Sequence, residues 1–124
     1  MDTYEDFSVT VDVRDKAVII SVAGEVDVAT APGLRSALDD VALSSGTPKN
    51  LVIDMTAVSF LDSTALGVLV SALRKSEEHG VRFGVVLSHP HVIKVFRVTN
   101  LDSLMTVHPT LEAALSPGVP SGAA

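Results

Sequence analysis

The stretch that decides the fold is LVIDMTAVSFLDSTALGVLVSAL, residues 51–73, which contains two elements of different periodicity. It begins with the short apolar run 51–55, which is typical of a buried central strand. After a loop, apolar side chains recur at helical spacing from 65 to 73. This helix is predicted to end at His79-Gly80, because glycine readily adopts the left-handed conformation of a C-cap. A buried strand followed by a helix predicts an α/β fold.

Toward the N-terminus, residues 9–13 alternate between valine and polar side chains in the period of a strand. Residues 17–23 form a second, more apolar run, so the two segments predict an antiparallel hairpin. The segment 24–27, Gly-Glu-Val-Asp, is predicted to be a polar link. Thr30 is a predicted N-cap with proline just inside the helix, and that helix is expected to end at the turn-forming residues 44–48.

Toward the C-terminus, residues 82–87 predict another buried strand, and Ser88-His89-Pro90 predicts the start of a helix that closes near Asn100. An edge strand is expected within 104–107 and a short final helix within 109–115. Strands alternating with helices imply a mixed, mostly parallel sheet of four to five strands with about four helices. We therefore expect one domain over residues 1–115. The tail 116–124 lacks apolar anchors and is predicted to be disordered.

The composition excludes several classes of protein. The chain has 124 residues, of which 47% are hydrophobic and 19% charged, so it suits one folded domain. It has no run of roughly 20 apolar residues and begins with acidic residues, which predicts a cytoplasmic protein without membrane insertion. It has no cysteine, so disulfides and thiolate chemistry are excluded. A net charge of −6 argues against nucleic acid as a partner.

The polar residues do not predict an enzyme. No Ser-His-Asp arrangement and no glycine-rich phosphate loop can be recognised. The pair His89 and His91 lacks suitably spaced carboxylates or cysteines, so neither a metal nor a cofactor is predicted. Asp62 and Ser63 stand at the start of the helix after the central strand. Considered alone, they are helix-capping residues.

Residues 54–67, DMTAVSFLDSTALG, resemble the STAS family and, within it, the anti-sigma factor antagonists. The family pattern is a strand ending in Asp, a loop with an apolar and an aromatic residue, and then Asp-Ser-Ser/Thr-Gly-Leu-Gly. Residues 24–27 match a second family segment, Gly-Glu-Leu-Asp. The expected order of elements agrees with the family from about residue 7 to 115.

This resemblance implies partner switching. In the family, the unphosphorylated antagonist binds an anti-sigma factor that is also a serine kinase, and so frees a sigma factor. The kinase phosphorylates the serine after Asp, which is Ser63 here, and a PP2C-type phosphatase restores the active form. Ala31 and Pro32 are expected on the same contact face as the partner-binding residues. The resemblance assigns partner binding to Asp27, Thr30, Asp62, Ser63, Thr64, Ala65 and Leu66.

The start of a helix suits such a switch. A phosphate on Ser63 would add about −1.5 to −2 charges, and the positive end of the helix dipole would compensate part of them. The fold is therefore expected to survive phosphorylation, while a docked partner is repelled.

One departure from the family supports an alternative. Ala65 stands where the family usually has glycine, and its methyl group is expected beside the acceptor, where it would hinder a kinase. The alternative is a non-phosphorylated STAS interaction module, such as a signalling scaffold or a transporter partner. Thr64 is a second candidate acceptor. A small-molecule or nucleotide sensor is suggested by fold analogy alone.

Overall fold

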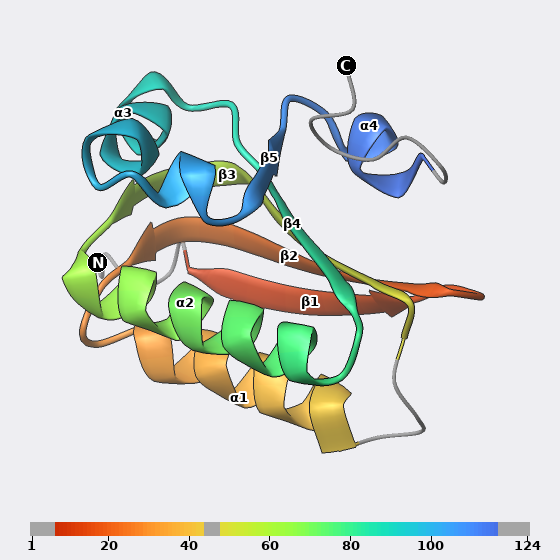
Figure 1. Ribbon diagram of the computed structural model, residues 1–124. Helices are drawn as coiled ribbons and strands as arrows, with labels where there is room; N and C mark the ends of the chain where they lie inside the picture. Colours follow the sequence, from red (N-terminus) through yellow and green to blue (C-terminus); the bar gives the residue numbers. More distant parts are fainter. Residues whose placement is uncertain (1–6, 44–47, 117–124) are drawn as a thin grey trace.

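The computed structural model describes residues 7–43 and 48–116 and contains a five-stranded sheet in the order β1-β2-β3-β4-β5 (Figure 1). Strand β1 is antiparallel to β2, and the remaining neighbours are parallel. The mixed, mostly parallel α/β sheet is therefore confirmed. The strands are β1 Ser8–Val13, β2 Ala17–Val26, β3 Asn50–Leu61, β4 Arg82–Val86 and β5 Thr106–His108.

Four α-helices connect or follow these strands in the described part of the chain. Helices α1 and α2 lie side by side on one face of the sheet, and α4 lies on the other, as Figure 1 shows. Alternate residues of the strands point to opposite faces. In β2, for example, Ile20 belongs to the large core under α1 and α2, and Ile19 to the small core under α4. The helices are α1 Ala31–Leu43, α2 Ser63–Glu78, α3 Pro90–Val98 and α4 Leu111–Leu115.

Strand β3 is longer than its sequence predicts. The expected strand ended at residue 55 and was followed by a loop, but β3 continues to Leu61 along β2. The β2–β3 pairing contains register shifts, and the buried residues here, Met55, Val58 and Leu61, are three apart rather than two. A search for strict alternation therefore misses this half of the strand.

The predicted polar link at 24–27 is also corrected. Gly24, Glu25 and Val26 are the last residues of β2, and Val26 is completely buried. Gly24 lies at one of the register shifts with φ 92°, which glycine adopts without a steric penalty. The polar stretch thus begins only at Asp27.

The helix boundaries follow local signals. Helix α2 ends as predicted, with Gly80 at φ 70°. The N–H of Val81 donates to the carbonyl of Ser76 at 2.8 Å, which completes a Schellman cap. His89 is the N-cap of α3, with Pro90 at its first position.

The C-terminal boundaries differ slightly from the prediction. Leu104 does not begin the last strand, because a 3-10 turn at Leu101–Ser103 precedes it and β5 starts at Thr106. Helix α4 is capped by Thr110 and ends at Leu115. The predicted disordered tail lies outside the described residues except for Ser116, and the turn predicted to end α1 lies outside them at 44–47. Within the described ranges, no helix is long and apolar enough to cross a membrane.

Candidate functional site

The two sequence segments that resembled the family lie together at one edge of the sheet. Strands β2 and β3 are parallel, so their C-terminal ends meet there, and α1 and α2 begin just beyond them (Figure 1). The N–H of Asp62 donates to the carbonyl of Val26 at 3.1 Å and joins the two segments directly. The loop after β2 and the start of α2 therefore form one surface.

Asp27 and Thr30 hold the loop after β2 in shape. The Asp27 carboxylate accepts the N–H of Ala29 at 2.9 Å and of Thr30 at 3.1 Å. The Thr30 hydroxyl accepts the N–H of Asp27 and donates back to the carbonyl of Glu25, each at 2.9 Å. Thr30 does precede α1, as an N-cap should, but its hydroxyl bonds backward to the end of β2. Its main role is to tie helix α1 to the strand.

Asp62 caps helix α2, and Ser63 is its first residue. The Asp62 carboxylate accepts the N–H of Ala65 at 3.1 Å. Ser63 is exposed, and its hydroxyl has no hydrogen-bond partner among the described residues. The capping role is therefore filled by Asp62, and the Ser63 hydroxyl is left available to another molecule.

The other predicted partner-binding residues differ in accessibility. Thr64 is exposed and Leu66 is half-buried. Ala65 and Thr30 are only 1% and 8% exposed, so their side chains shape this surface from beneath. The Ala65 side chain packs in the main core. The expectation that its methyl group lies beside the acceptor is therefore corrected. Ala31 is likewise buried, whereas Pro32 is exposed.

Two exposed apolar side chains at this edge were missed by sequence reasoning. Phe60 is 39% exposed and Val28 is 70% exposed. The Phe60 ring is stacked on that of His91, with centroids 6.1 Å apart and planes within 8°. Phe60 pairs with Glu25 across the β2–β3 ladder, so its position depends on the part of β3 that the prediction lacked. Exposed aromatic and aliphatic groups beside polar ones are typical of protein interfaces.

The edge is acidic. Glu25, Asp27 and Asp62 form no ion pair with any described residue. A phosphate on Ser63 would add about −1.5 to −2 charges to this acidic edge, and the positive end of the α2 dipole would offset part of them.

His89 caps helix α3, and His91 lies in the first turn of that helix. The His89 ring accepts the N–H of His91 at 3.2 Å through Nδ1. Within residues 7–43 and 48–116, no group of three or more His, Cys, Asp or Glu residues could hold a metal ion.

Comparisons with known proteins agree with this geometry. The STAS domain family model matches residues 8–114. The chain is 33% identical over 122 residues to the anti-sigma-F factor antagonist RsfB of Mycobacterium tuberculosis, covering 98% of this chain and 97% of that protein. It is 36% identical over 106 residues to the anti-sigma-B factor antagonist of Listeria monocytogenes, covering 82% and 89%.

A solved structure gives the same result. The crystal structure of an anti-sigma factor antagonist from Mycobacterium paratuberculosis is 35% identical, with a TM-score of 0.81, and the match covers 93% of this chain and 96% of that one. Family model, sequence and fold thus agree over almost the whole described chain. This chain belongs to the STAS domain family and, within it, to the anti-sigma factor antagonists.

Proposed function

We propose that this anti-sigma factor antagonist works by partner switching, with Ser63 as its phosphoacceptor. The observation that carries the proposal is the exposed Ser63 hydroxyl, which has no partner among the described residues because Asp62 already caps the helix. The unphosphorylated form binds an anti-sigma factor and so releases a sigma factor. In this scheme the chain is a kinase substrate and a binding protein, and it is not an enzyme.

The partner proposed for this surface is an anti-sigma factor with serine kinase activity. It docks on the edge that carries the loop after β2 and the start of α2. Phe60 and Val28 supply apolar contacts, while Asp27 and its acidic neighbours favour a partner with basic groups around an apolar centre. Sigma factor, kinase and ATP all belong to the cytoplasm, so the chain is proposed to act there.

Phosphoryl transfer to Ser63 then causes the complex to dissociate. The Ser63 oxygen bonds to the γ-phosphorus of ATP, ADP leaves, and the serine proton is lost. The new charge faces a partner surface that was packed against a neutral hydroxyl. A loss of about 3 kcal/mol at this contact weakens binding roughly a hundredfold. A PP2C-type phosphatase hydrolyses the phosphoserine and restores the binding form.

The fold is expected to tolerate the phosphate. The first N–H groups of α2 point toward it, and the helix dipole favours a negative group at this end. The Asp62 cap, which bonds to the N–H of Ala65, involves neither atom of the new ester. Phosphorylation therefore changes the surface and leaves the packing of α2 in place.

The alternative of a non-phosphorylated interaction module was motivated by Ala65. In the structure its side chain is buried in the main core, so the steric objection to a kinase at Ser63 loses its basis. Thr64 is the neighbouring exposed hydroxyl, and it provides the matched control for the acceptor assignment.

The test is phosphorylation by a cognate anti-sigma kinase with ATP, followed by mass spectrometry. We expect one phosphate on Ser63 in the wild type and in Thr64→Ala, and none in Ser63→Ala. Ser63→Ala should still bind the kinase, because only the acceptor is removed. Phosphate on Thr64, or no phosphate on any residue while the kinase binds tightly, would contradict the assignment and favour the module without a switch.

A further inference from the structure

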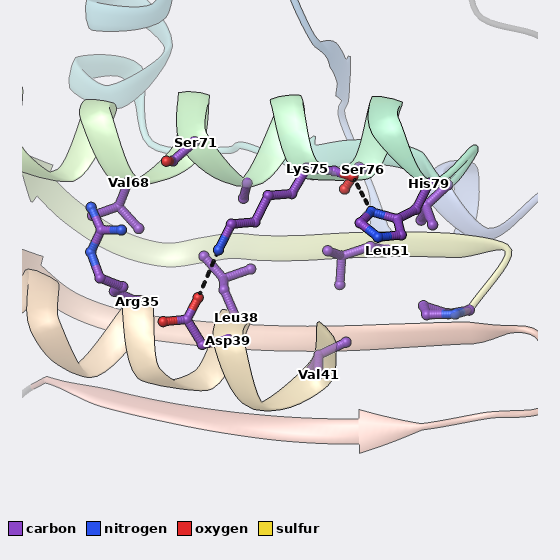
Figure 2. Close-up of a pocket in the computed structure, with 13 residues that line it drawn as sticks. Arg35, Leu38, Asp39, Val41, Leu51, Val68, Ser71, Lys75, Ser76 and His79 are labelled. Carbon is purple, nitrogen blue, oxygen red and sulfur yellow. Dashed lines mark hydrogen bonds and ion pairs between the residues drawn. The ribbon is translucent and has the colours of Figure 1, made fainter. Parts of the chain in front are cut away.

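A groove lies between α1 and α2, lined on α1 by residues from Arg35 to Val41 and on α2 by residues from Val68 to Ser76, with His79 just beyond (Figure 2). Apolar side chains from both helices and from β3 line its inner part: Leu38, Leu51, Val68 and Ala72. The groove has a volume of about 80 Å³. It belongs to neither the acidic edge nor the switch, so its lining calls for a separate explanation.

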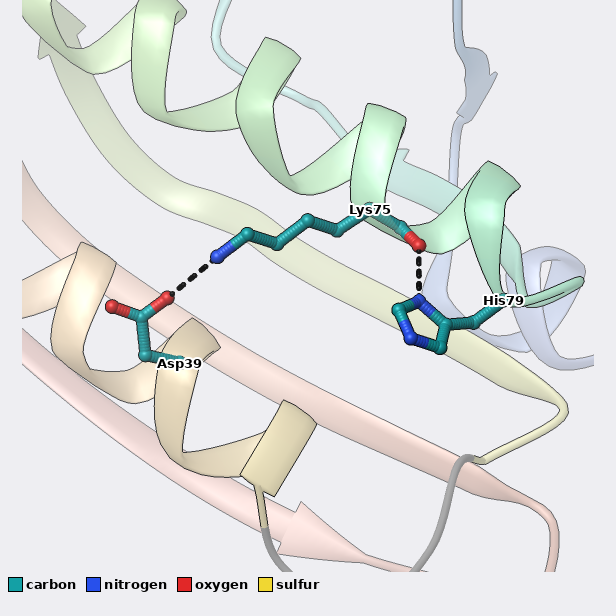
Figure 3. A network of polar contacts seen from close by, with 3 residues as sticks. All are labelled: Asp39, Lys75 and His79. Atoms are coloured by element: carbon teal, nitrogen blue, oxygen red, sulfur yellow. Dashed lines mark hydrogen bonds and ion pairs between the residues drawn. The ribbon is translucent and has the colours of Figure 1, made fainter.

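The rim of the groove is charged. Lys75 extends from α2 to Asp39 on α1, with Nζ 3.2 Å from Oδ1, and both side chains are about half exposed (Figure 3). Such an exposed ion pair is weak, so it opens readily when another anion competes for the lysine. Arg35 also lines the groove and forms no ion pair with any described residue. The rim therefore offers one unpaired cation and one cation in a labile pair.

His79 closes one end of the rim. Its Nδ1 lies 2.8 Å from the carbonyl oxygen of Lys75, so this nitrogen carries a proton and donates it (Figure 3). The contact holds the imidazole ring against the groove. With Arg35, Lys75 and one carboxylate, Asp39, the local charge is positive in a chain whose net charge is −6.

We propose that this groove binds a small amphiphile with an aliphatic chain and a carboxylate head. The apolar lining takes the chain, and the guanidinium of Arg35 takes the head, since its planar donors match a carboxylate. A nucleotide fits poorly, being much larger than the groove.

The groove lies between the two helices that begin at the acidic edge. Helix α1 starts directly after the loop that contains Asp27, and α2 starts at Ser63. A bound chain would therefore touch both helices without covering the switch, and binding at the groove can be measured independently of phosphorylation.

The test is a titration of ¹⁵N-labelled protein with hexanoate, followed by amide chemical shifts. We expect saturable shifts concentrated on residues 35–41 and 68–79. Pentan-1-ol and pentyltrimethylammonium, which have the same pentyl chain without the anionic head, should bind at least about tenfold more weakly. Equal binding of hexanoate and pentan-1-ol, or shifts that never saturate, would overturn the proposal.

Two variants locate the site. Arg35→Gln should weaken hexanoate binding by about tenfold or more, whereas Arg74→Gln, an exposed site on α2 outside the groove, should leave it unchanged. Ala72→Leu fills the inner part and should abolish the shifts, with a thermal melt to verify folding. If Ala72→Leu does not fold, the comparison of Arg35→Gln with Arg74→Gln still tests whether the groove binds hexanoate. Equal affinity of Arg35→Gln and Arg74→Gln would show that the rim does not recognise the head.

Discussion

Replacing Asp62 by alanine should destabilise the protein, whereas replacing its neighbour Ser63 by alanine should not. The Asp62 carboxylate accepts the N–H of Ala65 at 3.1 Å and is the N-cap of α2. Loss of such a cap costs about 1 kcal/mol, within a range of about 0.5 to 2. The Ser63 hydroxyl has no partner among the described residues, and alanine is the better helix former. Ser63→Ala should therefore change stability by less than about 0.5 kcal/mol.

Urea unfolding of the wild type and the two variants measures this difference. With equal m-values, Asp62→Ala should lower the midpoint and Ser63→Ala should keep it. In a thermal melt, the loss of about 1 kcal/mol corresponds to roughly 3–6 °C for a domain of this size. Asp62→Asn is the control, since its amide oxygen still accepts a hydrogen bond and should recover most of the stability.

The opposite result would refute the assignment of roles at this helix start. If Ser63→Ala destabilised the protein as much as Asp62→Ala, the serine hydroxyl would be a structural cap. Its modification would then disturb α2 itself. The idea of a switch that changes the surface and spares the fold would no longer hold.

Three further predictions follow from the same structure. Thr30→Val should lower the free energy of unfolding by about 1–3 kcal/mol in urea, because the N–H of Asp27 and the carbonyl of Glu25 lose their hydrogen bonds to the hydroxyl. Thr64→Val, at an exposed site, should be nearly neutral. Burial, with a smaller effect of the Arg82 charge, lowers the pKa of His108 below its usual 6.5, so the unfolded chain binds the proton more readily. The free energy of unfolding should therefore fall as the pH drops through about 6.5 and level off below the pKa of the folded state. His108→Gln should flatten this pH dependence, measured by urea unfolding at several pH values. Phe60→Ala should weaken kinase binding by about tenfold or more in calorimetry with little loss of stability, whereas an equal affinity would place the partner elsewhere.

The parts of the fold that local chemistry specifies could be predicted. Gly80 ends α2 because a positive φ is needed there, and Pro90 begins α3 because its missing N–H is not needed in the first turn. The apolar run at the start of β3 indicated a buried strand. Each of these features depends on residues that lie within a few positions of one another.

The remaining features depend on pairing between distant segments. The second half of β3 forms a strand because β2 shifts register opposite it, which no local period reveals. The same pairing sets Phe60 opposite Glu25 and so creates the exposed aromatic group of the acidic edge. The Thr30 hydroxyl bonds backward to Glu25 because α1 must be tied to the end of β2. The sequence pattern identified Thr30 as a helix-start residue, but the direction of its hydrogen bond required the tertiary structure.

The central claim is that a phosphate on Ser63 abolishes binding while the fold remains intact. The most direct measurement compares the dissociation constant of the cognate anti-sigma kinase for the unphosphorylated and the Ser63-phosphorylated protein, with a thermal melt of each form. We predict roughly hundredfold weaker binding of the phosphorylated form and an unchanged melting temperature. Equal dissociation constants would contradict the switch, and a large drop in melting temperature would show that the phosphate acts by unfolding α2.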